Sequence, residues 1–232
     1  MKSYEDFKNK PLPDHTKIDY WECLAKLTLE NFFSDDFSNL MIVDKPDLQS
    51  DNAGIEVTKA INPEQERNES LYVKIENGQI KDRENAIRVI NNSYKPRKAF
   101  INGVEIRETD RYDDGILAGI PERINFKRII KAFEEKVKKL NAGGYKLYLS
   151  NMLFVYSYIL ANQSMIDEAI NEMRIIQSRY KYKYSKVYIY VPSYIYVLDL
   201  IKNKGEIIDI KEYQYFLGTL AREMVIEEEI KG

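Results

Sequence analysis

Two carboxylates stand close together in the stretch KPDLQSDNAGIEVTKAI, residues 45–61. Asp47 follows a proline, and Glu56 lies in an apolar run that alternates in polarity as a β-strand does. An unpaired carboxylate buried in such a strand costs on the order of several kcal/mol or shifts its pKa until it is neutral. Mg²⁺ and Mn²⁺ take oxygen ligands, commonly from one or two protein carboxylates. The turn around Gly54 allows Asp47 and Glu56 to converge on such a cation.

Two other environments would also accommodate Glu56. A salt bridge to a lysine would compensate its charge, and a partly hydrated position at the edge of a sheet would leave the carboxylate in contact with water. The stretch alone leaves these alternatives open beside the metal site.

The scarcity of histidine and cysteine restricts the chemistry. His15 is the one histidine and lies in a polar segment flanked by prolines, where we expect a solvated loop residue. Cys23 is the one cysteine, so an internal disulfide and a Cys-rich zinc site are excluded. The sequence disfavours histidine-based triads, HExxH zinc sites and histidine phosphorelays. Chemistry would therefore use carboxylates, lysines, hydroxyls and a hard metal ion.

The overall charge and hydropathy give no sign of a general attraction to nucleic acid or to a membrane. The chain has 35 basic and 37 acidic residues, so no global positive field attracts nucleic acid or an anionic membrane. No apolar stretch approaches the roughly 18–20 residues that span a bilayer, and the opening MKSYEDFKNKPLPDHTKIDY lacks the apolar core of a secretory signal. We expect a cytoplasmic protein with no membrane partner.

Periodicity, capping residues and turn signals predict the elements that position these residues. Helices are expected over 19–33 with Asp19 as N-cap, from Asn62 for about three turns, and over 121–140, 164–180 with Ser164 as cap, and 211–230. Strands are expected over 39–44, 54–60 and 145–156, and as two runs within 186–200 separated by Pro192-Ser193. A hairpin is expected around Asn102-Gly103 in AFINGVEIRE.

This order of elements predicts the fold class and the domain organisation. Residues 1–18, which contain Pro11 and Pro13, are interpreted as an extended N-terminal arm, and residues 19–232 as a single domain. Mixed helices and strands indicate an α/β or α+β fold, in which helices cover the faces of a layered sheet.

The carboxylate motif and its surroundings resemble a known family. PDLQSDNAGIEVTKA is similar to the core motif of the PD-(D/E)XK nuclease superfamily: Pro-Asp at one strand end, a spacer, and an apolar strand that carries Glu with a polar residue two places on. IIKAFEEKVKKLNAGGYKLYLSNMLFVY resembles the helix and strand that follow in uncharacterised bacterial members with an EVT strand. The resemblance covers residues 20–155. It implies a restriction-endonuclease-like central mixed sheet flanked by helices, with additional C-terminal strands and helix.

The resemblance also implies an activity. Members of the superfamily hydrolyse phosphodiester bonds with Mg²⁺, so Asp47 and Glu56 would bind Mg²⁺ or Mn²⁺, and a lysine would help to orient or activate the attacking water. Nucleic acid would be the partner, and DNA is favoured by analogy with the family.

The lysine departs from the family pattern, which places it two residues after the glutamate. This chain has Thr58 there and Lys59 one step later, and the two-residue period of a strand directs Lys59 away from Glu56 unless a bulge rotates it. Lys136 lies at the margin of the apolar face of helix 121–140 and can bury its stem while its amine reaches the sheet. Lys136 is therefore the candidate catalytic lysine; the alternative is an ordinary lysine that borders an apolar stripe.

Three further signals have two interpretations each. Glu22 could be a third acidic contributor, as first-helix glutamates are in some members, or it could pair with Lys26 at i,i+4. The basic helix segment 123–139 could contact phosphates or be a solvated face. SRYKYKYSKVYIYV could stack bases or form an amphipathic edge strand.

Two other functions remain as alternatives to a nuclease. The absence of lysine at position 58 favours a catalytically inactive member of the fold that binds nucleic acid or a protein partner. The tyrosine-rich strands favour a homo-oligomeric structural or assembly protein, because exposed aromatic patches often form interfaces.

Overall fold

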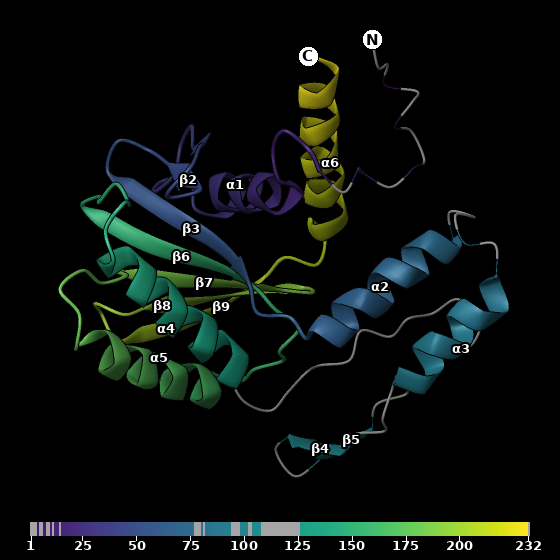
Figure 1. Ribbon diagram of the computed structural model, residues 1–232. Coiled ribbons are helices and arrows are strands. Elements are labelled where there is room, and N and C mark those ends of the chain that lie inside the picture. The colour runs from purple at the N-terminus through teal and green to yellow at the C-terminus, as the bar shows by residue number, and fades with distance from the viewer. Residues whose placement is uncertain are drawn as a thin grey trace.

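A computed structural model describes residues 15–76, 82–93, 98–101, 104–107 and 126–231, together with residues 4, 7, 10, 12, 13 and 80. Its framework is a seven-stranded mixed sheet, so the class is α/β (Figure 1). The three central strands β3, β6 and β7 run parallel, and the other neighbours pair antiparallel. In sheet order the strands are β1 (Met41–Ile42), β2 (Leu48–Gln49), β3 (Ala53–Lys59), β6 (Ser150–Tyr156), β7 (Lys186–Val191), β8 (Tyr194–Asp199) and β9 (Lys204–Asp209).

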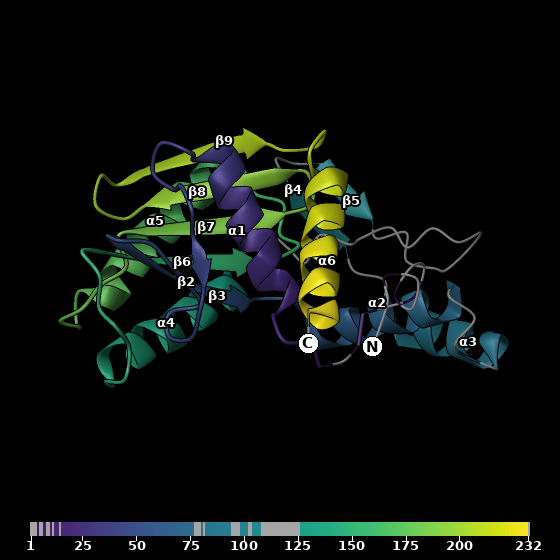
Figure 2. The same ribbon diagram turned by 90° about the horizontal axis from the view of Figure 1, so that it is seen from above.

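Helices cover both faces of this sheet, as Figures 1 and 2 show. α4 and α5 pack on one face, and α1 and α6 pack on the other. Between β3 and α4 in the sequence, α2, α3 and the two-stranded sheet β4–β5 lie beside the main sheet. The bounds are α1 (Tyr20–Phe32), α2 (Pro63–Glu76), α3 (Arg83–Ser93), β4 (Lys98–Ile101), β5 (Val104–Arg107), α4 (Lys127–Asn141), α5 (Gln163–Gln177) and α6 (Gln214–Ile230).

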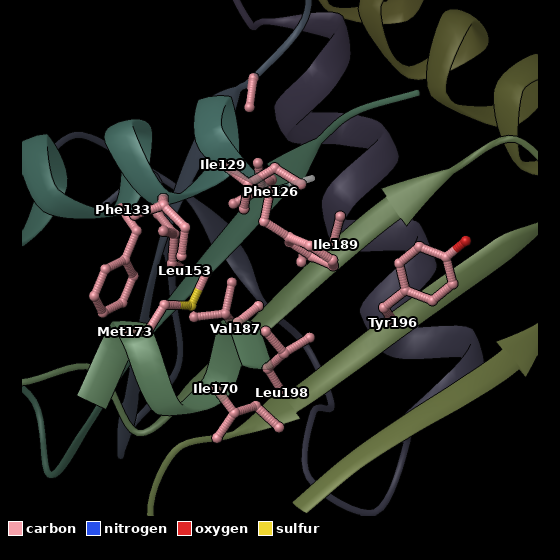
Figure 3. Packing of buried hydrophobic residues seen from close by; sticks show 14 of the residues in the cluster. Phe126, Ile129, Phe133, Leu153, Ile170, Met173, Val187, Ile189, Tyr196 and Leu198 are labelled. Atoms are coloured by element: carbon pink, nitrogen blue, oxygen red, sulfur yellow. The ribbon is translucent and has the colours of Figure 1, made fainter. Parts of the chain in front are cut away.

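Alternation along the parallel strands divides the core into two layers. On β6, Leu153 and Val155 belong to the layer under α4 and α5, whereas Phe154 and Tyr156 belong to the layer under α1 and α6. Figure 3 shows the first layer, where Phe133 of α4 lies near Leu153 and other apolar side chains of the sheet. Because both faces of these strands are covered, the apolar run is continuous over residues 152–156 of β6 and 187–191 of β7.

Local sequence signals account for the ends and the buried faces of α1 and α4. Asp19 caps α1, because its Oδ1 accepts hydrogen bonds from the amides of Trp21 (2.7 Å) and Glu22 (3.3 Å). The buried apolar side chains of α4 recur at the spacing of one helical face, and Gly143 and Gly144 follow the helix with positive φ angles of 89° and 88°. Both predictions are confirmed.

The strand predictions are confirmed for β3, β7 and β8 and need correction elsewhere. β1 confirms a strand within 39–44, but it has two residues and lies at the sheet edge with Met41 59 % exposed, so the strand is shorter than expected and not buried. The strand expected from Tyr145 begins at Ser150. β2 and β9 were not predicted, because β2 is too short to show alternation and β9 is mostly exposed.

The helix predictions differ from the structure mainly at the ends. Asn162, not Ser164, caps α5, because its side chain accepts the amide of Met165 at 3.0 Å. α4 begins at Lys127, and the part of the prediction over 121–125 lies outside the described residues. α3 was not predicted. The pairing of β4 with β5 confirms the hairpin, whereas its turn at Asn102-Gly103 lies outside the described residues.

Described residues of the N-terminal arm lie against α6. Phe7 is 5 % exposed, and Arg222 of α6 donates from Nη2 to the carbonyl of Phe7 at 2.8 Å and to that of Lys10. Among the helices of the described residues, none is long and apolar enough to cross a bilayer.

A close approach at Gly54 fixes the loop that carries Asp47. A Cβ atom at Gly54 would lie 2.5 Å from Cδ2 of Tyr148 and 2.7 Å from Cγ of Pro46, distances too short for real contacts. Glycine therefore lets the Pro46–Asp47 segment and the Tyr148 ring close over the start of β3.

Gly54→Ala should therefore destabilise the fold. We expect a loss of about 1–3 kcal/mol in the free energy of unfolding, because the added methyl group must displace a ring or the proline. Urea unfolding measures this, with Asp51→Ala at an exposed position of the same turn as the control, expected to change stability by less than about 0.5 kcal/mol. Equal stability of the Gly54→Ala and wild-type proteins would contradict the close packing.

Candidate functional site

Glu56 is a buried carboxylate in the middle of β3. It is 5 % exposed, and its position pairs with Leu153 of the neighbouring parallel strand β6. Its side chain lies on the face of the sheet that α4 covers, opposite to Ile55, which packs in the layer under α1 and α6. The predicted alternation of β3 is thus confirmed, and it places an acidic group against an otherwise apolar layer.

Two donors hold one oxygen of this carboxylate. Lys136 of α4 donates from Nζ to Oε1 of Glu56 at 2.5 Å, and the hydroxyl of Tyr145 donates to the same oxygen at 2.9 Å. The side chains of Lys136 and Glu56 are 16 % and 6 % exposed, so water screens this ion pair weakly. The other oxygen, Oε2, is buried and has no hydrogen-bond partner within the described part of the chain.

Asp47 approaches the same region from the loop before β2. Its Oδ2 accepts a hydrogen bond from the amide of Val57 at 2.6 Å, so the loop carboxylate is fixed to the residue next to Glu56. The antiparallel pairing of β2 with β3 explains the approach, because Leu48 lies opposite Ile55. The structure thus brings Asp47, Glu56 and Lys136 together.

Burial and mutual repulsion raise the pKa values of two acidic side chains near Glu56. The pKa of Asp47 is raised to about 6, mainly by burial and further by the Glu56 carboxylate, although the Val57 amide and Lys136 oppose the shift. The pKa of Glu22 on α1 is raised to about 7, first by burial and then by Asp47, with a smaller effect of Glu56. Glu22 is therefore electrostatically part of the same acidic region.

Tyr145 is a residue of the site that sequence reasoning missed. It follows Gly143 and Gly144 after α4, and its place in the sequence predicted only the start of the strand expected over 145–156. Burial and its hydrogen bond to Glu56 raise the pKa of Tyr145, so the hydroxyl remains a donor at neutral pH. A second tyrosine near Lys136 is Tyr184, whose hydroxyl donates to the carbonyl of Lys136 at 3.4 Å. Burial raises the pKa of Tyr184.

Two other sequence candidates, Thr58 and Lys59, lie on β3. Lys59 points to the opposite face, with Nζ 5.3 Å from the ring centroid of Trp21, and it forms an ion pair with Glu66. Thr58 is half-buried. Lys26 bonds to Glu30 at 2.5 Å, so the alternative pairing of Lys26 with Glu22 is wrong.

The donor set fits a cation with few protein ligands. No three or more His, Cys, Asp and Glu side chains of the described residues are grouped so that they could hold a metal ion. Asp47 and Glu56 offer two carboxylates, and Oε2 of Glu56 is a buried acceptor without a described partner. Mg²⁺ commonly uses one or two protein carboxylates and completes its shell with water and phosphate oxygens. These residues would suit such a cation.

Comparisons of the chain with protein-family models, with curated protein sequences and with solved structures found no match. The resemblance to the PD-(D/E)XK superfamily therefore stays a prediction from the motif, and a functional proposal depends on the geometry around Glu56.

The raised pKa values predict a pH dependence of stability. Between about pH 4 and pH 7 the folded chain binds more protons at Glu22 and Asp47 than the unfolded chain, because their pKa values of about 7 and about 6 exceed the ordinary 4.5 and 3.8. Their contribution to the free energy of unfolding thus decreases as the pH rises through this window. Glu22→Gln should weaken the decrease, as measured by urea unfolding at several pH values.

Glu135→Gln is the matched control, because Glu135 is an exposed acid on α4. It should leave the pH profile unchanged. A Glu22→Gln profile identical to that of the wild type would contradict the raised pKa of Glu22.

Proposed function

We propose that the protein is a Mg²⁺- or Mn²⁺-dependent nuclease that hydrolyses phosphodiester bonds, with a restriction-endonuclease-like fold. One observation carries the proposal: Glu56 is buried, Lys136 and Tyr145 hold its Oε1, and its Oε2 has no partner among the described residues. Asp47 stands beside it, fixed by the amide of Val57.

Each residue has a distinct part in this proposal. A divalent cation held by Asp47 and Glu56 would polarise the scissile phosphate and lower the pKa of a bound water. Tyr145 donates to Oε1 of Glu56 and so orients the carboxylate. Lys136 has three donor hydrogens on its ammonium, so it can hold Glu56 with one and direct another toward the attacking water or a phosphate oxygen.

The surrounding elements support the comparison with the nuclease motif. The Pro-Asp pair precedes β2, the glutamate lies on the adjacent antiparallel strand, and the lysine that the motif lacks at position 58 comes from α4. The exposed face of α4 is also basic, which suits a phosphate backbone. Its exposed basic residues are Lys127, Arg128, Lys131, Lys138 and Lys139.

The same ion pair favours a second candidate, a catalytically inactive domain that binds nucleic acid or a protein partner. Lys136 already compensates the charge of Glu56, so the buried carboxylate does not require a cation. In this case the pair is structural, and removal of the lysine alone would leave an uncompensated buried charge.

Calorimetric titration with Mn²⁺ and a cleavage assay test the nuclease proposal. The wild type should bind Mn²⁺ and cleave DNA, and Glu56→Gln should abolish both while the circular dichroism spectrum is retained, because a neutral amide is a poor ligand for a hard cation. Lys136→Met should retain Mn²⁺ binding and lower the cleavage rate by about a hundredfold or more, as the loss of a water-orienting group does.

Lys138→Met is the matched control, because Lys138 is an exposed lysine on the same helix. It should leave cleavage unchanged. A wild type that neither binds Mn²⁺ in the presence of DNA nor cleaves DNA or RNA would instead support the inactive domain. In that case Lys136→Met would only lower the free energy of unfolding, by about 3–5 kcal/mol.

A further inference from the structure

A hollow lies on the face of the sheet opposite to Glu56, between α1, α6 and the carboxyl ends of the parallel strands. Ile61 follows β3, Ser157 follows β6 and Pro192 follows β7, and all three line this pocket of about 650 Å³. Ligands of open α/β sheets bind at the carboxyl ends of the strands. The volume lies within the range of about 300–1,000 Å³ that small-molecule sites occupy.

Aromatic side chains form one continuous wall of the pocket. Trp21 contacts Tyr20 with a centroid separation of 5.3 Å and Tyr156 with 4.6 Å, and Tyr156 contacts Tyr190 at 5.4 Å. The hydroxyl of Tyr156 donates to the backbone carbonyl of Trp21 at 2.6 Å, which fixes the Tyr156 ring relative to the backbone of α1. Tyr215 of α6 also lines the pocket, and it is 87 % exposed. The pocket therefore offers rigid rings and one accessible ring for stacking.

The charge of the lining is positive. Lys211 and Arg222 line the pocket, and none of its described lining residues is Asp or Glu, although acids outnumber bases by 37 to 35 in the whole chain. Arg222 is held in place by the carbonyl of Phe7. Lys211 is exposed, and its ammonium lies 6.0 Å from the ring centroid of Tyr194. An anionic group at the pocket mouth would meet the Lys211 ammonium, whereas the neighbouring Asp209, whose Oδ1 accepts the amide of Lys211 at 2.9 Å, does not line the pocket.

We propose that this pocket binds a small anionic ligand with a planar aromatic ring, of the size and chemistry of a nucleoside monophosphate. The ring would stack against Tyr215 and the aromatic wall, and the phosphate would bind Lys211. Asp47, Glu56 and Lys136 do not line this pocket, so the proposal does not depend on nuclease activity.

The size of the pocket favours a free small molecule over the interior of a nucleic-acid strand, because about 650 Å³ is the volume of a small-molecule site. A strand binder typically offers a positively charged groove along which successive bases stack. Here α1 and α6 flank the hollow, and Figure 2 shows these two helices side by side over the sheet. One ring and one phosphate can be accommodated, and the terminal nucleotide of a strand is the competing source of the same chemistry.

The one tryptophan of the chain, Trp21, provides a direct readout, because its fluorescence should change when a ligand occupies the pocket. The probes are the ribonucleoside monophosphates of adenine, guanine, cytosine and uracil, with adenosine, inorganic phosphate and short oligonucleotides for comparison. At least one monophosphate should give a saturable change, and adenosine and phosphate should each bind at least about tenfold more weakly. Isothermal calorimetry verifies the affinities.

Tyr215→Ala and Lys211→Gln should each raise the Kd of that monophosphate by about tenfold or more. Both residues are exposed, so these variants should keep the wild-type thermal unfolding. The matched controls are Phe216→Ala, which removes a 54 % exposed ring next to Tyr215, and Lys204→Gln, at an exposed lysine of β9 outside the pocket. Both controls should bind as the wild type does.

Three results would overturn the proposal. The first is no saturable binding of any monophosphate by either method. The second is binding that Tyr215→Ala and Lys211→Gln leave unchanged. The third is binding of oligonucleotides through Tyr215 and Lys211 that is at least about a hundredfold tighter than that of every monophosphate, which would assign the surface to a strand end.

Discussion

A charge buried in a sheet constrains the arrangement of this molecule. Glu56 stands in the central region of the sheet with 5 % exposure, and an isolated carboxylate there would be strongly unfavourable. The ammonium of Lys136 and the hydroxyl of Tyr145 compensate it, so α4 must lie across β3 in one register and the chain after α4 must return to the same point. The loop before β2 is fixed to the same strand, because Asp47 accepts the amide of Val57. Packing and electrostatics therefore select the same arrangement.

The parts of this arrangement that depend on residues close together in the sequence could be predicted. The alternation of β3, the cap at Asp19 and the apolar face of α4 each depend on neighbouring residues, and that face placed Lys136 toward the sheet. Tyr145 and the coupling of Glu22 to Asp47 depend on contacts between distant segments, which periodicity does not report. Prediction of the two-residue strands and of the mostly exposed β9 failed for the same reason. The pairing of these strands is set by their neighbours in the sheet rather than by their own sequence pattern.

The two proposed sites use the two faces of one set of strands. On β6, alternate residues face the α4 layer and the α1–α6 layer, and the latter collects Phe154, Tyr156 and, from β7, Tyr190. Part of the abundance of tyrosine, eighteen in all, is explained on this face, where Trp21 packs edge to face on Tyr156 and the aromatic rings line a hollow at the strand ends. The other face holds the carboxylates and the lysine. Glu22 on α1 still connects the two faces electrostatically, because Asp47 and Glu56 contribute to its raised pKa.

The parallel pairing of β3 with β6 joins segments that are far apart in the chain. Ala53 lies opposite Ser150, and the Glu56–Lys136 contact spans 80 positions. During synthesis on a ribosome, which proceeds from the N-terminus, β3 emerges long before its partner strand and its counter-ion. The carboxylate must then remain hydrated, and β3 cannot settle into the sheet until α4 and β6 have followed. The charge of Glu56 at the centre of β3 thus delays hydrophobic collapse of the early chain. This delay protects β3 from aggregating with other molecules before β6 has been synthesised.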